Sequence, residues 1–149
     1  MNGSPGTFIL VDDDHEDAYL MQRALDFGRV SARLIHLPDG TSFLHHIRNN
    51  RLPEPCLVLL DLNMPVRDGF SVLEILREAK ALPTLPLIVY TTTSDRLQVE
   101  RAYQAGAKAF ITKPTSLKEA AGLFESLAST WFRYGTIPSG IGPFSGIAI

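Results

Sequence analysis

The stretch that decides the fold reads PCLVLLDLNMP and covers residues 55–65. An apolar run between two prolines, starting at Cys56 and stopping at Asp61, is typical of a strand buried on both faces. Such a strand predicts a parallel sheet with helices on each side. Asp61 then lies at the carboxyl end of the strand, where open α/β sheets have their ligand crevice. For this aspartate alone, a loop cap and a reactive group are equally good explanations.

The composition fits one globular domain, with 149 residues of which 45% are hydrophobic and 20% are charged. A net charge of -2 gives no general reason to bind nucleic acid or an anionic membrane, so we expect neither partner. The single cysteine, Cys56, is predicted to be a buried core residue. Residues 1–7 lack the features of a signal peptide, and no apolar run is long enough to span a bilayer. We expect a soluble, cytoplasmic protein.

Apolar segments alternate with amphipathic ones along the whole chain. The spacing predicts strands at 8–11, 32–37, 56–61, 87–90 and 108–112. Helices are predicted at 15–27, 41–50 and 70–79, in a run ending at Ala105, and from a cap at Ser116 to Trp131. Because single helices separate the strands, the pattern predicts an α/β fold, a three-layer doubly wound (βα)5 sandwich around a five-stranded parallel sheet.

Polar side chains follow four of the predicted strands. Asp12 and Asp13 follow the first, Asp61 the third, Thr91 the fourth and Lys113 the fifth. Since the carboxyl ends of parallel strands meet at one edge of the sheet, a single crevice can contain them all. Three neighbouring carboxylates require a compensating cation, and oxygen ligands favour a hard ion such as Mg²⁺, or Mn²⁺.

The same set of residues suits phosphoryl transfer. A divalent cation and Lys113 neutralise the three acids and can offset the charge of a phosphoryl group. A threonine hydroxyl can donate to one phosphoryl oxygen while an aspartate oxygen attacks in line. The joint occurrence of these residues favours Asp61 as a phosphoacceptor over Asp61 as a loop cap.

This set, together with the Leu60–Pro65, Ala105–Ala107 and Lys113–Pro114 segments, resembles the receiver domain of bacterial two-component response regulators over residues 8–134. The resemblance implies the flavodoxin-like strand order 2-1-3-4-5. It also implies that Asp61 accepts a phosphoryl group from a phosphohistidine on a sensor histidine kinase. Asp13 would bind the metal directly and Asp12 through water, together with Asp61 and the main-chain carbonyl of Asn63.

Further roles follow from the same resemblance. Thr91 would bind a phosphoryl oxygen in the active state and Lys113 would pair with the phosphoryl group. Phe110 occupies the position of a switch aromatic, and a cis peptide is expected before Pro114. Asn63 and Thr93 would flank the path of the hydrolytic water and tune the lifetime of the phosphoryl group.

Segments 91–94, 109–114 and 130–138 look like those of the single-domain regulators that partner cyanobacterial phytochromes. This likeness implies a red/far-red photoreceptor kinase as donor. It also implies homodimers formed through the face that carries the fourth helix, fifth strand and last helix. Trp131, Phe132 and Tyr134 exceed what one core face requires, which favours an interface at the end of the last helix.

The chain is expected to divide into a flexible leader (1–7), the receiver domain (8–134) and an uncharged tail (135–149) with no output domain. A flexible terminus is the simpler interpretation of the tail, and a docking peptide is the alternative. We expect no conventional enzyme, only catalysis of the chain's own phosphoryl transfer and dephosphorylation.

Three other classes of protein are alternatives to a phosphorylated receiver domain. One superfamily of aspartyl-phosphate phosphatases typically has its nucleophile in Asp-x-Asp on the first strand, whereas here Asp61-Leu62-Asn63 follows the third strand. A flavin-binding module would need a loop after the first strand that accepts phosphate, and the acids at 12–14 would repel one. A scaffold that is never phosphorylated would be expected to lack a site residue, and none is missing.

Overall fold

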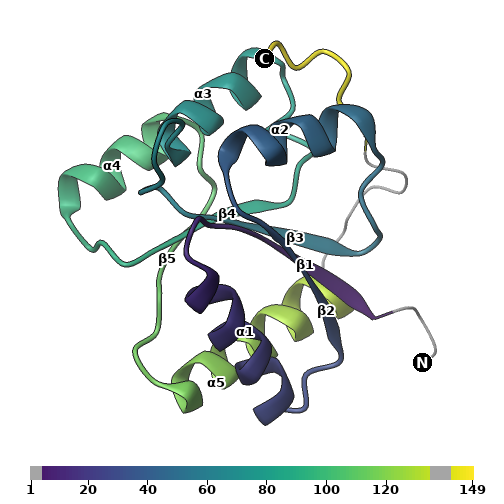
Figure 1. Cartoon of the computed structure of the whole chain (residues 1–149), viewed down its shortest axis with the longest axis vertical. Coiled ribbons are helices and arrows are strands. Elements are labelled where there is room, and N and C mark those ends of the chain that lie inside the picture. Colours follow the sequence, from purple (N-terminus) through teal and green to yellow (C-terminus); the bar gives the residue numbers. More distant parts are fainter. Residues whose placement is uncertain (1–4, 135–141) are drawn as a thin grey trace.

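The computed structural model describes residues 5–134 and 142–149, which form a parallel sheet between two layers of helices (Figure 1). The strands are β1 (Gly6–Val11), β2 (Ala32–Leu37), β3 (Cys56–Leu60), β4 (Leu87–Thr91) and β5 (Phe110–Thr112). All neighbouring strands are parallel, and their order is β2-β1-β3-β4-β5. The predicted doubly wound sandwich and its strand order are confirmed.

Helices cover both faces of the sheet (Figure 1). On one face lie α1 (His15–Phe27) and α5 (Leu117–Leu127), and on the other lie α2 (Gly40–Asn49), α3 (Gly69–Glu78) and α4 (Arg96–Gln104). Asp14 and Asp68 begin α1 and α3, and each side chain accepts a hydrogen bond from a main-chain N–H of the first turn. The capped N-termini of α1 and α3 therefore lie beside the carboxyl ends of the strands.

The central strands are buried on both faces, as the apolar run at 56–60 predicts. In β1, Ile9 and Val11 pack in the core beneath α2 and α3, whereas Phe8 and Leu10 pack in the core beneath α1 and α5. This alternation follows from the two-residue period of a strand. The strands that carry the acids are therefore held firmly from both sides.

Three elements differ from the prediction by two residues or more, and one of them is β5, which starts at Phe110 and not at Lys108. Strand β1 begins at Gly6, because Gly6 and Thr7 pair with β2 and Thr7 also pairs with Cys56 of β3. These two residues therefore belong to the sheet and not to a flexible leader, whereas residues 1–4 lie outside the described part. Helix α5 continues as a π-helix, η1 (Ala128–Tyr134). Its Phe132 ring packs 4.9 Å from that of Phe8, centroid to centroid, and a Cβ on Gly6 would collide with it.

The final residues are packed on the domain, which contradicts a flexible terminus for residues 142–149. The N–H of Phe144 donates to the carbonyl of Ile47 at the end of α2, at 2.9 Å. Ile147 is only 3% exposed and joins the core beneath α2 and α3. Burial of one large aliphatic side chain contributes about 1.5–3 kcal/mol, which offsets the conformational entropy lost by about one or two residues. Residues 135–141 of the predicted tail lie outside the described part.

No helix within the described ranges 5–134 and 142–149 combines the length and apolar character that crossing a bilayer requires.

Candidate functional site

Main-chain hydrogen bonds align the strand ends that carry the candidate residues. The N–H of Asp61 donates to the carbonyl of Val11 at 3.0 Å, so the hydrogen-bond ladder between β3 and β1 continues to Asp61. The N–H of Lys113 donates to the carbonyl of Thr91 at 2.8 Å in the same way. The backbone of the sheet therefore brings residues far apart in sequence to one edge.

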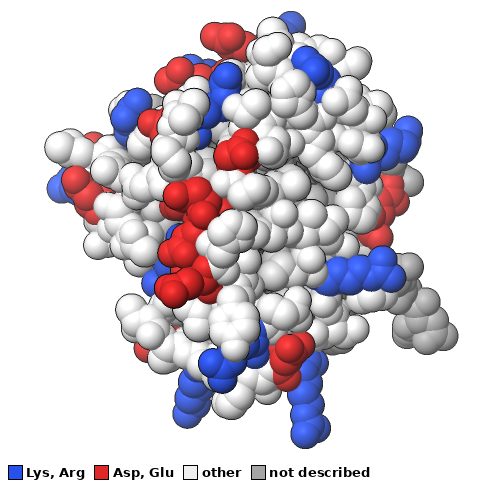
Figure 2. All heavy atoms as spheres, in the orientation of Figure 1, with Lys and Arg blue, Asp and Glu red and all other residues white. Residues whose placement is uncertain are grey.

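Three carboxylates converge at this edge. One oxygen from each of Asp12, Asp13 and Asp61 lies within 4.8 Å of the others. Asp12 is fully buried and Asp61 is 5% exposed, whereas Asp13 is exposed. They line an open cleft of about 560 Å³ to which Asn63 and Lys113 also contribute. Figure 2 shows acidic side chains gathered on the surface over the carboxyl ends of the strands.

This donor set fits a hard divalent cation. Both oxygens of Asp12 already accept hydrogen bonds, from the N–H of Asp14 at 2.9 Å and from Nζ of Lys113 at 2.7 Å. Such an arrangement suits contact with a metal through water. The carboxylates of Asp13 and Asp61 supply the anionic oxygens that Mg²⁺ or Mn²⁺ prefers.

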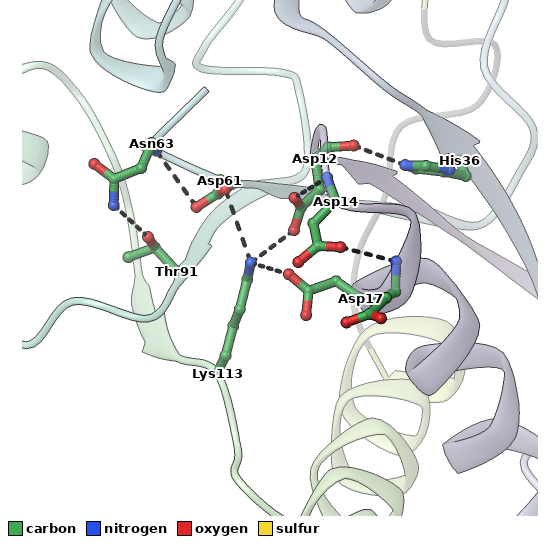
Figure 3. Close-up of polar contacts among 9 residues, drawn as sticks. Asp12, Asp14, Asp17, His36, Asp61, Asn63, Thr91 and Lys113 are labelled. Carbon is green, nitrogen blue, oxygen red and sulfur yellow. Dashed lines mark hydrogen bonds and ion pairs between the residues drawn. The ribbon is translucent and has the colours of Figure 1, made fainter. Parts of the chain in front are cut away.

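Lys113 lies between the acids (Figure 3). Its ammonium donates to Asp12 and to Asp17, while Oδ2 of Asp61 is 3.8 Å away, beyond hydrogen-bond distance. Burial alone would lower the pKa of Lys113, but the bonds to Asp12 and Asp17 and the charge of Asp61 outweigh burial and raise it. Lys113 therefore remains a cation.

Burial also changes the proton affinities of the two buried acids. It raises the pKa of Asp12 from 3.8 to about 6, although the bond from Lys113 acts in the opposite direction. The pKa of Asp61 is raised as well, chiefly by burial, while Lys113, Thr91 and the N–H of Asn63 lower it. A bound cation would favour the ionised form of both acids.

The hydroxyl-bearing residues lie on the opposite side of Asp61 from Asp12. The fully buried Thr91 accepts a hydrogen bond from the side-chain amide of Asn63 at 3.4 Å (Figure 3). Thr92 lines the cleft, whereas the hydroxyl of Thr93 accepts from the N–H of Asp95 at the start of α4. Phe110 is half-buried against the core beneath α2 and α3, away from the acids.

The prediction of a cis peptide before Pro114 is wrong. Among the described residues, cis peptides precede Pro55 and Pro143 instead. An X-Pro bond favours trans by about 0.5–1 kcal/mol unless its surroundings impose cis. Here the trans chain still brings the ammonium of Lys113 to Asp12 and Asp17.

Sequence reasoning missed the contribution of Asp17. The predicted site did not include Asp17, yet its carboxylate pairs with Lys113. Its place in the first turn of α1, directly after the acids at 12–14, was an available signal. Gly69, which follows Asp68, lies one residue before the predicted start of its helix at 70. It is the first residue of α3, and a Cβ there would collide with the carbonyl of Asp61.

The fold and the site together define a class of protein, a parallel doubly wound domain with an acidic cation site and a lysine at the carboxyl edge of its sheet. The chain belongs to the response regulator receiver domain family, whose sequence profile matches residues 8–123. Receiver domains are signalling proteins and not conventional enzymes.

Two response regulators are similar to this chain over most of its length. Response regulator Rcp1 of Synechocystis sp. is 30% identical over 139 residues, which are 91% of this chain and 95% of Rcp1. The crystal structure of the phosphorylated cyanobacterial phytochrome response regulator RcpA has a TM-score of 0.77 at 27% identity, covering 91% of this chain and 99% of RcpA.

Two further solved structures are similar to this chain. Response regulator RPA3017, described in red light signaling of R. palustris, has a TM-score of 0.80 at 27% identity and covers 90% of this chain and 99% of its own. The Mn²⁺-bound form of Rcp1 has a TM-score of 0.74 at 29% identity and covers 91% of this chain and all of its own. The Mn²⁺-bound form of this relative, together with the acidic cluster found here, supports a divalent metal site.

Proposed function

We propose that Asp61 accepts a phosphoryl group from the phosphohistidine of a sensor histidine kinase, with Mg²⁺ or Mn²⁺ bound at the acidic cluster. The observation that carries this proposal is the position of the Asp61 carboxylate. It lies within 4.8 Å of the oxygens of Asp12 and Asp13 on one side and 3.8 Å from Nζ of Lys113. A nucleophile between a cation site and an ammonium is what transfer of a phosphoryl group to a carboxylate requires.

In the proposed reaction, an Asp61 oxygen attacks phosphorus in line and the P–N bond to the kinase imidazole breaks. The imidazole leaves with the bonding electrons, and Asp61 becomes an acyl phosphate. Lys113 and the hydroxyl of Thr91 would donate to phosphoryl oxygens. A cation held by Asp13, Asp61 and the carbonyl of Asn63, with Asp12 contacting it through water, supplies charge neutralisation when it is bound.

Loss of the phosphoryl group would be a second reaction at the same site. Water attacks phosphorus, phosphate leaves, and the carboxylate of Asp61 is restored. We assign Asn63 and Thr93 to tuning this lifetime, because Asn63 lines the cleft and Thr93 directly follows Thr92, which also lines it. The Thr91 hydroxyl accepts from the side-chain amide of Asn63, so its own O–H remains available to donate to a phosphoryl oxygen.

The signal would leave the site through the face formed by α4, β5 and α5. A shift of Thr91 toward the phosphoryl group would free space for Phe110, the proposed switch aromatic. That face would then bind a partner or a second copy of the chain, giving a homodimer. Trp131 and Phe132 already pack partly against the core beneath α1 and α5, so only their exposed portions would contribute to such contacts.

The proposed donor is a phytochrome kinase that acts in the cytoplasm. Support comes from RcpA, which is described as a cyanobacterial phytochrome response regulator, and from RPA3017, which is described in red light signaling. Each is similar to this chain over nearly its whole length. Phosphotransfer from candidate kinases under red and far-red light tests this assignment. Equal transfer from kinases unrelated to phytochromes would contradict it.

Intact-mass measurement tests the phosphoacceptor. With Mg²⁺ and phosphoramidate, the wild type should gain one phosphoryl group and Asp61→Asn none. Asp26→Asn, on the exposed face of α1, is the matched control and should be labelled like the wild type. Equal labelling of Asp61→Asn and the wild type would refute the assignment.

In calorimetric titrations, Asp13→Ala should weaken Mg²⁺ binding by about tenfold or more, because one of the few charged ligands is lost.

A further inference from the structure

The ammonium of Lys113 is shared unequally among three carboxylates. It donates to Asp12 at 2.7 Å and makes a short hydrogen bond to Asp17, but it stands 3.8 Å from Oδ2 of Asp61. Figure 3 shows Asp12 and Asp17 on the same side of the ammonium, with Asp61 and Thr91 on the other. The lysine is therefore held toward α1 and away from the acceptor.

Asp17 is tied to α1 and is poorly able to follow the lysine. Its main-chain N–H donates to the carbonyl of Asp14 at 3.1 Å, and Asp14 is the N-cap of the helix. Further along α1, Met21, Ala24 and Leu25 are buried against the sheet and α5. A movement of Lys113 toward Asp61 would therefore stretch or break its bond to Asp17.

Asp17 also changes the charge balance of the site. With Asp12, Asp13 and Asp61 it brings four carboxylates, against one positive charge on Lys113 and two on a divalent cation. The site then keeps one unit of negative charge before any phosphoryl group arrives. Phosphorylation adds further negative charge, and like charges in a partly buried site repel one another.

We propose that Asp17 is a positioning residue that competes with the phosphoryl group on Asp61 for the ammonium of Lys113. The proposal rests on the proposed function, because it concerns the same acceptor. In the unphosphorylated state Asp17 keeps Lys113 on the α1 side of the cleft. In the phosphorylated state the lysine turns to a phosphoryl oxygen, and the carboxylate of Asp17 loses its partner. Asp17 thereby lowers the stability of the phosphorylated state.

Equilibrium binding of beryllofluoride tests the competition, because this tetrahedral anion stands in for a phosphoryl group on a carboxylate and is not hydrolysed. Affinities are measured at saturating Mg²⁺, so that changes in metal affinity do not contribute. Asp17→Asn keeps the shape of the side chain and removes its charge. We expect it to bind beryllofluoride about fivefold more tightly than the wild type, the size of effect that one partly exposed charged contact produces.

Glu16→Gln is the matched control. Glu16 lies in the same helical turn and lines the same cleft, but it is not among the ion-pair partners of Lys113 in the described residues. It should change the affinity by less than about twofold, since a change in general charge alone is screened at the surface. Asp17→Glu, which keeps the charge within reach of the lysine, should return the affinity toward that of the wild type.

The outcomes separate this inference from the proposed function. Equal or weaker binding by Asp17→Asn, in a variant with a wild-type melting temperature, overturns the competition while the phosphoacceptor stands. Equal gains in Asp17→Asn and Glu16→Gln also overturn it, because general charge would then explain the effect. If the wild type itself does not bind beryllofluoride with Mg²⁺, the phosphoacceptor fails and the competition fails with it.

Discussion

Replacing the buried Asp12 by asparagine should change how the stability of the metal-free protein depends on pH. Burial raises the pKa of Asp12 from 3.8 to about 6, so the folded protein binds this proton more tightly than the unfolded chain. The stability contributed by protonation is fully present below about pH 4 and is lost as the pH rises through about 6. The whole shift corresponds to about 3 kcal/mol, at 1.36 kcal/mol for each pH unit.

Integration of the linkage relation gives the measurable part of this effect. Between pH 4.5 and 7.5, the contribution of Asp12 should fall by about 2 kcal/mol. Asp12→Asn cannot titrate, so the free energy of unfolding of the wild type should decrease by that amount relative to the variant. Asp12→Asn also weakens the bond to Lys113, but a loss of stability that is the same at every pH does not affect this change with pH.

Urea unfolding in the presence of EDTA, at several pH values across this range, provides the measurement. Asp26→Asn on the exposed face of α1 controls for the chemistry of the substitution. If the difference between the wild type and Asp12→Asn stays constant within about 0.5 kcal/mol, the raised pKa is wrong. Added Mg²⁺ at pH 7.5 should then stabilise the wild type more than the variant, because binding to the folded state alone raises its stability.

Three further substitutions test how the loops and the tail support the site. Gly69→Ala should lower the free energy of unfolding by about 2 kcal/mol and slow labelling of the acceptor, because the new Cβ would lie 2.8 Å from Cα of Leu62. Gly122→Ala, which meets no atom within 4 Å in α5, should by contrast be neutral or stabilising in the same urea titration. Val66, with a φ of +67°, occupies a left-handed conformation that a β-branched residue disfavours, so Val66→Asn should raise the melting temperature by the equivalent of about 1 kcal/mol. Ile147→Ala should cost about 2–4 kcal/mol in urea unfolding, whereas the exposed Ala148→Ser should cost less than about 0.5 kcal/mol, and equal effects would contradict a docked tail.

Much of the fold was readable from local sequence patterns. The apolar run at 56–60 predicts a strand buried on both faces, and the structure buries all five of its residues. The alternation of strands with single helices predicts parallel pairing, which all four strand pairs confirm. Helix ends were less predictable. The π-helix that continues α5 depends on how Phe132 packs on Phe8, a contact between the two ends of the domain.

For the candidate site as well, the sequence predicts some features and only the tertiary structure decides others. By itself the sequence determined that Asp12, Asp13, Asp61, Thr91 and Lys113 share one edge of the sheet, because parallel strands present their carboxyl ends together. Proximity follows from topology alone, whereas individual contacts do not. Only the tertiary structure decided that Lys113 donates to Asp17 and stands 3.8 Å from Asp61, that the peptide before Pro114 is trans, and that Ile147 is buried. Each of these depends on side-chain and main-chain packing between segments far apart in sequence. For Asp61, whose role as cap or acceptor was open at first, the sequence supplied its place in the fold, and packing supplied its neighbours.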